Sequence, residues 1–528
     1  MTAKKTGGFF RTHPAATTLI GLVTASFALR LWPVLTVGQS WEDAYFFIGL
    51  ARSLAQGRYE LLGQFHSKYL PGFPAAILVL HTIGLGLIGW FRSAQFVSAL
   101  SSSALPGLCF LLAWDITGDR RAAGAAGLMA ALNAHLITFG GMAFSEAFFT
   151  MQAMLVLVLL RRAPLLAGII AGYAAVTRHE GWFLAAAFLA LAALSDERRR
   201  LLAGLGIALL MGAAWWLIYH MNTGEWPYQI YLVESAERAP TMGRPGLKFL
   251  LASFPAAGHL TTLLALAGLP VMFRKREGWP ALAFFIPYSA LHAWWMFGVE
   301  RYFVPLIPLV CVAAGSGLWS LENLARTLWN GAPPLEENSG TARSSPRLFR
   351  ARALMVPALG LIAGASHFAG FAPAMVHEEA VRTSGYLKAI REVAAKPEDF
   401  SVLAYDAFMV GYYDPRHPVI PSGMLPDTNW METIPPLYLE QGLRYIIWSD
   451  LYPSDRAQTE LSPGRELLLQ GKITQNDERR TFNLRLVPER QYIWLYEYPQ
   501  RGWLRPWRAE VSEERKAIIY RLELMPGA

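Results

Sequence analysis

The chain has 528 residues, a length that would suit roughly three or four soluble domains. Hydrophobic residues make up 53% of it and charged residues only 16%, against about 25% in a typical globular chain, and the mean hydropathy is +0.28. These values exclude a disordered, collagen-like or coiled-coil chain and indicate a polytopic membrane protein with some soluble mass. The net charge of +8 lies in short clusters between apolar runs, which is typical of membrane topology and not of nucleic-acid binding.

Apolar stretches begin close to the N-terminus. Residues 15–29 follow Lys4, Lys5 and Arg11, and we predict that they form an uncleaved first span with a cytoplasmic N-terminus. Further uncharged stretches occur at 69–91, 93–114, 122–145, 147–160, 163–177, 181–194, 201–219, 249–273, 278–299, 302–321 and 353–376. Since a membrane helix needs about 20 residues, the short stretches 163–177 and 181–194 could be half-depth helices that meet at a polar site.

Basic clusters between the stretches orient the chain. They are Arg120-Arg121, Arg161-Arg162, Arg198-Arg199-Arg200, Arg274-Lys275-Arg276 and the basic residues from Arg326 to Arg352. The positive-inside rule places all of them in the cytoplasm, provided that 69–91 does not cross the membrane. Pro71 and Pro74 at its start, and glycines near its end, favour a re-entrant or interfacial segment there. This gives about eleven spans, an odd number that places the C-terminus outside.

Two later regions change in composition. Residues 322–352 are polar and contain several prolines, glycines and serines, so we predict a flexible cytoplasmic linker. After residue 376 charges become frequent and apolar runs shrink to strand length. Strands are predicted at Ser401–Tyr405, Leu443–Trp448 and Tyr492–Tyr496, and helices at 383–395 and 432–441.

The chain is therefore predicted to be an α-helical polytopic membrane protein with a C-terminal soluble α/β domain. The transmembrane domain covers residues 1–376 and includes a first outer loop at 38–92. The soluble domain covers residues 377–528, a common domain size, and is expected on the extracytoplasmic face.

Two adjacent carboxylates, Glu42 and Asp43, follow the first span. Apolar residues then recur at helical spacing, at Phe46, Phe47, Leu50 and Leu54. We predict an amphipathic helix on the membrane surface with Asp43 near its N-terminus, where the helix dipole favours an ionised carboxylate. An N-cap aspartate beside a solvated glutamate explains the pair equally well from spacing alone.

The same loop continues with His66, Lys68 and Tyr69. The imidazole of His66 and the ammonium of Lys68 would lie near the bilayer surface, where a lipid phosphate would be found. Snorkelling to lipid headgroups is the commoner reason for such side chains.

Three further charged groups are flanked by apolar sequence: Glu146, Arg178-His179-Glu180 and Glu300-Arg301-Tyr302. On the topology above, all three fall on the same outer face as Asp43. A charge at the bilayer centre costs about 2.5–3.5 kcal/mol, so charges in such a setting are functional candidates. The alternatives are an internal ion pair that holds the turn at Arg178–Glu180 and a headgroup contact for Arg301.

The histidines and cysteines of the sequence give little indication of a functional site. Single histidines at positions 81, 135, 220, 259, 292 and 367 lack metal-ligand spacing and are typical of core or interface positions. Cys109 and Cys311 lie in apolar runs, as buried small hydrophobic residues do. Glycine-rich nucleotide loops are absent from the sequence, which argues against a cytosolic nucleotide-sugar or ATP site.

Several short motifs, taken in order, resemble the membrane-embedded GT-C glycosyltransferases, and most nearly glycosyltransferase family 39. That group includes protein O-mannosyltransferases and lipid A aminoarabinose transferases. The motifs are Glu42-Asp43-Ala44-Tyr45, residues 50–57, Leu70-Pro71-Gly72-Phe73-Pro74, Ser145-Glu146, Thr177-Arg178-His179-Glu180-Gly181 and residues 301–308. They span residues 41–310, while the tail after residue 376 is only weakly similar to the soluble domains of some relatives.

The resemblance implies the GT-C fold and transfer of a sugar from a polyprenyl-phosphate donor on the outer face of the membrane. The family's catalytic base maps onto Asp43, or onto Glu42 if the register slips by one, and its second-loop acidic residue maps onto Glu146. The Glu-Asp order departs from the usual Asp-Glu or Asp-Asp and leaves the base open. Arg301 matches the arginine that would face the lipid phosphate.

The chemistry fits these residue types. A carboxylate can take the proton of an acceptor as it attacks the anomeric carbon, and one direct displacement inverts that carbon. The leaving lipid phosphate is anionic and needs cations, which Arg301, Arg178 and Lys68 could supply. The candidate catalytic residues are Asp43, Glu42 and Glu146. The candidate binding residues are Lys68, Tyr69, His66, Arg178, His179, Arg301 and Tyr302. No cofactor is certain, and some relatives bind a divalent metal, for which the sequence offers no clear ligand set.

We therefore expect an inverting glycosyltransferase whose partners are a lipid-linked sugar, an acceptor lipid, glycan or protein, and membrane lipids, without nucleic acid. A bacterial inner membrane is the default location, with the C-terminal domain periplasmic. The alternative is a non-catalytic flippase or transporter, or a protein that binds a lipid-linked glycan. Transporters place charges near mid-membrane and commonly show repeats, whereas the acidic residues here gather in an outer loop.

Overall fold

The computed structural model describes residues 14–38, 42–61, 64–65, 69–227, 246, 249, 251, 256–294, 300–330, 346–404, 406–421, 430–449, 467–475, 478–499 and 509–525. Contacts divide the chain into two compact units. Unit 1 comprises residues 1–37 and 47–376 and is helical, whereas unit 2 comprises residues 38–46 and 377–528 and contains a mixed sheet.

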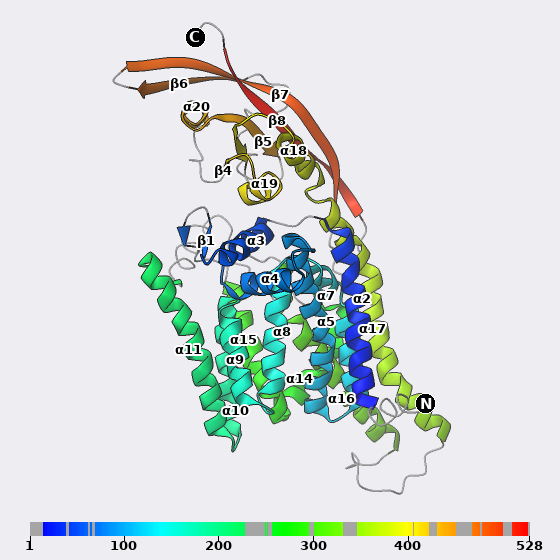
Figure 1. Cartoon of the computed structure of the whole chain (residues 1–528). Coiled ribbons are helices and arrows are strands. Elements are labelled where there is room, and N and C mark those ends of the chain that lie inside the picture. The colour runs from blue at the N-terminus through cyan, green and yellow to red at the C-terminus, as the bar shows by residue number, and fades with distance from the viewer. Residues whose placement is uncertain are drawn as a thin grey trace, which may run out of the picture. The chain divides into compact units, whose positions relative to one another are not determined.

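Unit 1 is an assembly of apolar helices (Figure 1). Its elements are α2 (Pro14–Thr36), α3 (Glu42–Ala55, whose first residues belong to unit 2), β1 (Glu60–Leu61), β2 (Gln64–Phe65), α4 (Gly72–Ile83), α5 (Trp90–Thr117), α6 (Arg120–Ala131), α7 (Ala134–Gly140), α8 (Ser145–Leu159), α9 (Pro164–Ala175), η1 (His179–Phe183), α10 (Leu184–Leu194), α11 (Arg198–Thr223), α14 (His259–Arg274), η2 (Arg276–Gly278), α15 (Trp279–Trp294), η3 (Glu300–Phe303), α16 (Ile307–Asn330) and α17 (Pro346–Val381, whose last residues belong to unit 2).

The length and composition of these helices identify an integral membrane protein. Within the described residues, five helices are long and apolar enough to cross a membrane, and a sixth span results if α6 and α7, which bend by 54°, are counted as one. Shorter apolar helices, among them α8 and α14, accompany them. The count of about eleven spans stays a prediction.

Short helices form where the apolar stretches of the sequence are too short to cross a membrane. Helix α9 has 12 residues and α10 has 11, and the polar turn at Arg178 separates them, as their short apolar stretches predicted. Helix α4 also has 12 residues, below the about 20 that a crossing needs. In Figure 1 it lies at one end of the bundle, and its place as a re-entrant or interfacial segment stays a prediction.

The expected linker at 322–352 is partly helical. Helix α16 continues to Asn330 and α17 begins at Pro346, so helical structure extends into the predicted linker from both sides. Residues 331–345 lie outside the described part. The polar composition of this segment predicted a flexible linker. Leu321, Leu324 and Leu328 nevertheless recur at helical spacing, so the last turns of α16 keep an apolar stripe.

Helix α5 is the centre of unit 1. It packs against α2, α6, α8 and α16, and a larger share of it is buried than of the other long apolar helices. The bent pair α6–α7 packs beside it, and the break between them is held by side chains from other helices.

Three buried side chains satisfy the backbone at the α6–α7 break. Arg30 of α2 is fully buried and donates from Nη1 to the Ala131 carbonyl (2.7 Å) and from Nη2 to the Ala130 carbonyl (3.2 Å). The Asn133 side chain accepts from the Leu136 amide (3.0 Å), and His367 Nδ1 of α17 accepts from the Ala134 amide (3.1 Å). Because backbone groups in an apolar interior need partners, these contacts permit the break.

Helices α14 and α16 approach each other through glycines. A Cβ atom at Gly268 would overlap the Ala313 carbonyl, and one at Gly317 would overlap the Leu264 carbonyl. Small residues allow membrane helices to pack backbone against backbone. The contact therefore needs hydrogen at both positions.

We expect Gly268→Val to destabilise the protein by about 1–3 kcal/mol or more, because the added methyl groups must push α14 away from α16. Cys109 and Cys311 are both buried, so the temperature at which a thiol-reactive fluorophore labels them reports unfolding. Gly206→Val is the control, since nothing lies within 4 Å of a Cβ at Gly206. Equal labelling temperatures for the two variants would contradict the backbone contact.

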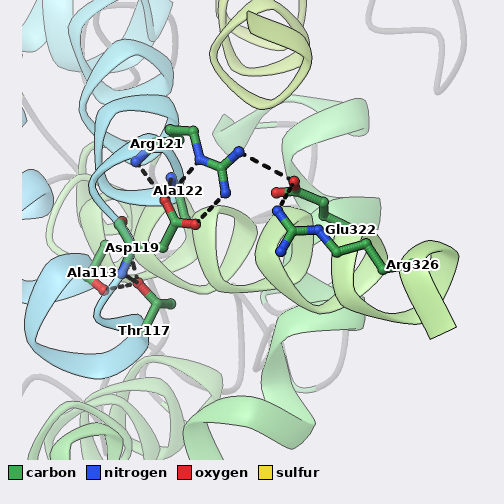
Figure 2. Close-up of polar contacts among 7 residues, drawn as sticks. All are labelled: Ala113, Thr117, Asp119, Arg121, Ala122, Glu322 and Arg326. Atoms are coloured by element: carbon green, nitrogen blue, oxygen red, sulfur yellow. Dashed lines mark hydrogen bonds and ion pairs between the residues drawn. The ribbon is translucent and has the colours of Figure 1, made fainter. Parts of the chain in front are cut away.

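An ion-pair network ties the start of α6 to α16 (Figure 2). Asp119 caps α6 by accepting from the Arg121 amide (2.7 Å) and also pairs with Arg121 Nη2 (2.8 Å). Glu322, nearly buried, receives Arg121 Nη1 (3.2 Å) and Arg326 Nη2 (2.5 Å). Burial acts to raise the pKa of Asp119, but the hydrogen bonds and charge of Arg121 outweigh it, so this pKa lies below its ordinary value.

Asp119→Ala should cost about 0.5–2 kcal/mol by removing the cap, whereas Asp119→Asn keeps a capping acceptor and should cost less. Because the pKa of Asp119 is lowered on folding, its charge stabilises the protein above the ordinary pKa of about 3.9 and ceases to do so as the pH falls through the folded value. Thermal unfolding followed by tryptophan fluorescence between about pH 5 and 2 should therefore show a steeper acid loss of stability for wild type than for Asp119→Asn. Parallel pH profiles would contradict this pairing.

Unit 2 is built on a six-stranded mixed sheet of order β4-β3-β5-β8-β7-β6. Its strands are β3 (Ser401–Ala404), β4 (Val419–Pro421), β5 (Leu443–Ser449), β6 (Leu467–Gln475), β7 (Glu478–Pro499) and β8 (Ala509–Leu524), and its helices are α18 (Ser384–Ala394), α19 (Ala407–Tyr413) and α20 (Trp430–Glu440). Strands β3, β4 and β5 pair in parallel and the others antiparallel. The core of unit 2 includes Leu403, Ile446 and Ile518.

Candidate functional site

A cluster of buried charges joins three segments that are distant in the sequence. Glu146 lies in the first turn of α8, Arg178 lies between α9 and η1, and Arg301 lies in η3. Arg178 Nη1 is 2.8 Å from Glu146 Oε1, and Arg301 Nε is 3.5 Å from the same oxygen. Arg178 Nη1 also donates to Ser145 Oγ (3.2 Å). One carboxylate oxygen therefore organises two guanidinium groups.

The second guanidinium nitrogen of Arg178 meets another carboxylate. Its Nη2 lies 2.8 Å from Glu180 Oε1, and His292 Nε2 of α15 lies 3.3 Å from the same oxygen. Arg178 is thus held between Glu146 and Glu180, with both terminal nitrogens engaged. Two carboxylates and two guanidiniums balance in formal charge, so the cluster can exist in an apolar surrounding.

An aromatic ring supports the two arginines. The guanidinium carbons of Arg178 and Arg301 lie 5.5 and 5.3 Å from the centroid of the Tyr302 ring, within cation–π range. His292 stacks on the same ring at 4.8 Å. The Tyr288 hydroxyl of α15 donates to the Tyr302 carbonyl (3.0 Å), so η3 is fixed to the neighbouring helix.

Local sequence explains the turn that carries Arg178. A Cβ at Gly181 would overlap the backbone of Ala174 and Ala175, so glycine is needed where η1 folds back on α9. The start of α4 closes the same corner, because the Gly72 amide donates to the Val176 carbonyl (2.8 Å) and the Tyr173 hydroxyl donates to the Gly72 carbonyl (2.8 Å). The motif at 70–74 therefore packs directly against the end of α9.

The two arginines are buried to a similar degree and differ in the length of their ion pairs to Glu146. The Glu146 side chain is 2% exposed, those of Arg178 and Arg301 are 13% and 15% exposed, and that of Glu180 is 9% exposed. Arg178 makes two ion pairs at 2.8 Å, while the ion pair of Arg301 within the cluster is the longer one, at 3.5 Å. Arg301 is therefore the less tightly held guanidinium at Glu146.

The structure brings together Glu146, Arg178, Arg301 and Tyr302 from the set that sequence singled out. His179 begins η1 beside them. Tyr69 takes part in first-loop packing, where its ring lies 5.1 Å from that of Phe47. His66 and Lys68 lie outside the described residues.

Glu42 and Asp43 occupy the first turn of α3, as the spacing of the apolar residues predicted. Both belong to residues 38–46, which group with unit 2. Within that unit, the ring of Tyr45 packs on Tyr412 (5.5 Å) and Tyr413 (6.0 Å) of α19. The start of α3 is therefore anchored in unit 2 by aromatic contacts.

His292 is the member of the cluster that sequence reasoning missed. Single histidines in apolar runs are usually core residues, and its spacing matched no metal or catalytic motif. Its contact with Glu180 depends on the packing of α15 beside η1, and no local sequence pattern predicts that packing. The expected alternative of an Arg178–Glu180 ion pair is present and coexists with the Glu146 contact.

In the described part of the chain, no group of three or more His, Cys, Asp or Glu side chains is arranged to hold a divalent metal ion. Glu146 and Glu180 each have an arginine partner. The residues of this cluster therefore do not fit a metal site.

Comparison with solved structures identifies the fold. The chain has the fold of the membrane-embedded GT-C glycosyltransferases, the class that its motifs resemble. One structure that shares it is ArnT from Cupriavidus metallidurans bound to undecaprenyl phosphate, with a TM-score of 0.57, 16% identity and coverage of 95% of this chain and 97% of that one.

Two structures of the oligosaccharyltransferase from Archaeoglobus fulgidus also share the fold. The AglB complex with an inhibitory peptide and a dolichol-phosphate has a TM-score of 0.55 and 12% identity, and covers 83% of this chain and 70% of that one. The complex with zinc and sulfate has a TM-score of 0.52 and 13% identity, and covers 81% and 67%. No family model matches the sequence, and a search of curated proteins finds no match.

We expect Arg178→Gln to destabilise unit 1 by about 3–5 kcal/mol, because it leaves Glu146 and Glu180 without their shared counter-charge. The labelling temperature of Cys109 and Cys311 measures the loss. Arg301→Gln should lower the labelling temperature by less, because the ion pair between Arg301 and Glu146 is longer, at 3.5 Å. Arg200→Gln, at a side chain that is 74% exposed, is the control and should match wild type. A smaller effect at Arg178 than at Arg301 would overturn this ranking.

Proposed function

We propose that the protein is an inverting glycosyltransferase that moves a sugar from a polyprenyl-phosphate donor to an acceptor on the outer face of the membrane. The observation that carries the proposal is the meeting of Arg178 and Arg301 at Glu146, at the ends of short membrane helices in a GT-C fold. The neighbouring structures support the donor class, since ArnT is bound to undecaprenyl phosphate and AglB to a dolichol-phosphate.

In this reaction the acceptor hydroxyl or amine attacks the anomeric carbon while the bond from that carbon to the phosphate oxygen breaks. The acceptor proton passes to a carboxylate, and the polyprenyl phosphate leaves with the bonding electron pair. We assign the base to Asp43, whose place in the first turn of α3 favours the ionised carboxylate, and Glu42 is the neighbouring candidate.

The leaving phosphate needs positive charge. Arg301 suits this role because its ion pair with Glu146 is the longer one and its guanidinium lies against the Tyr302 ring. Arg178 is committed to Glu146 and Glu180, so we assign it a positioning role. Glu146 pairs with both arginines, and we assign it to orienting them.

The remaining candidates are proposed to contact the donor. His66, Lys68 and Tyr69 precede α4, and His179 adjoins Arg178, so these residues are proposed to contact the lipid phosphate or the sugar. The basic clusters support a cytoplasmic N-terminus and an extracytoplasmic domain at 377–528. The acceptor is a lipid, a glycan or a protein.

The test is consumption of polyprenyl-phosphate sugars by the purified protein in proteoliposomes. We expect Asp43→Asn to lower kcat by about 10²–10⁴-fold, as the loss of a general base does, and Arg301→Ala by about 10²–10³-fold, as the loss of a charge-stabilising donor does. Asp196→Asn, an exposed residue outside the cluster, is the matched control and should leave turnover unchanged.

Each other outcome has a defined meaning. Loss of turnover in Glu42→Gln with retention in Asp43→Asn moves the base by one residue. If wild type carries the lipid across the bilayer without consuming donor, the enzyme assignment is wrong and the flippase alternative replaces it. Turnover unaffected by Arg301→Ala removes that residue from the phosphate site.

A further inference from the structure

Helix α5 carries four polar side chains on one face: Arg92, Gln95, Ser98 and Ser102. They are spaced three or four residues apart, so they line one side of the helix. Each bonds to backbone carbonyls of other segments. Ser101 behaves differently, because its hydroxyl donates to the Val97 carbonyl of its own helix (2.7 Å).

Gln95 joins two distant backbone segments. Its fully buried Nε2 donates to the Val37 carbonyl (3.0 Å), just past the end of α2, and to the Gly141 carbonyl (3.0 Å), just past the end of α7. Its Oε1 accepts from Arg92 Nη1 (2.7 Å), which holds the amide in this orientation. Both carbonyls lie beyond helix ends, where no intrahelical donor is available.

Ser98 fixes the next part of the same segment. Its Oγ donates to the carbonyl of Phe144 (2.8 Å), the residue that caps α8 immediately before Ser145 and Glu146. Space is tight along this segment, since a Cβ at Gly141 would overlap Pro33 of α2. The backbone at 141–144 is therefore held between α2 and α5.

We propose that Gln95 and Ser98 are positioning residues for the transfer reaction. They hold the backbone from which Glu146 reaches Arg178 and Arg301, and Gln95 also holds the end of α2, which precedes Glu42 and Asp43 in the chain. This inference rests on the proposed function. Its physical basis is that a displacement of about 1 Å in a reacting group can lower turnover by up to about 100-fold.

The experiment compares two buried serines of one helix. Ser98→Ala removes the bond to Phe144, whereas Ser101→Ala removes a bond within α5 and is the matched control. Gln95→Met removes both amide donors at similar volume. We measure kcat and KM for the polyprenyl-phosphate sugar, the labelling temperature of Cys109 and Cys311, and hydrogen exchange of the amides from 137 to 147.

We expect kcat to fall on the order of 10- to 100-fold in Ser98→Ala and Gln95→Met. Amide exchange at 141–147 should rise in both, Ser98→Ala should keep the labelling temperature of Ser101→Ala, and Ser98→Thr, which retains the hydroxyl, should recover turnover. If wild type consumes donor and the kcat values of Ser98→Ala and Gln95→Met equal that of Ser101→Ala, the inference is wrong. The proposed function still stands in that case. If wild type consumes no donor, the proposed function is wrong and this inference falls with it.

Discussion

Backbone groups inside an apolar bundle must find hydrogen-bond partners, and this constraint explains the buried polar residues around the breaks between α6, α7 and α8. An unpaired group in a membrane interior costs several kcal/mol, so a chain that leaves the helical path there must bring its own partners. Arg30 and His367 supply them at the break between α6 and α7, and Gln95 and Ser98 supply them between α7 and α8. The break can therefore lie within the bundle and lead directly to Glu146.

The charged cluster follows the same logic with larger energies. Neither Glu146 nor Arg178 could be buried alone, because an isolated charge in a low-dielectric surrounding is far more costly than a paired one. Pairing makes these residues depend on one another. Arg178 pairs with the carboxylates of Glu146 and Glu180, and the ring of Tyr302 contacts both arginines. Such a preorganised set of charges can meet an anionic group without rearranging water, which is why the proposed transfer assigns the leaving phosphate to this place.

Sequence reasoning performed best where a pattern is local. Apolar run length predicted the short helices α9 and α10, and helical spacing predicted α3 with Asp43 in its first turn. The bend at Asn133 escaped it because 122–145 is continuously uncharged and the partners of the break, Arg30 and His367, lie far away in the chain. Strand β8 escaped it because frequent charges obscure its alternation, and β6 escaped it because three consecutive leucines begin it without alternation. The apolar strands β3 and β5 were predicted.

The sequence by itself determined that this is a membrane protein with a soluble α/β tail, and it selected Glu146, Arg178 and Arg301 as charges out of place in apolar surroundings. Those conclusions need only composition, run length and the cost of burying a charge. Only the tertiary structure decided that these charges form one cluster, that His292 belongs to it, and that Arg178 is held between two carboxylates. The reason is that ion pairs form between atoms a few ångströms apart, and the distances between helices depend on packing that no single segment of the sequence encodes.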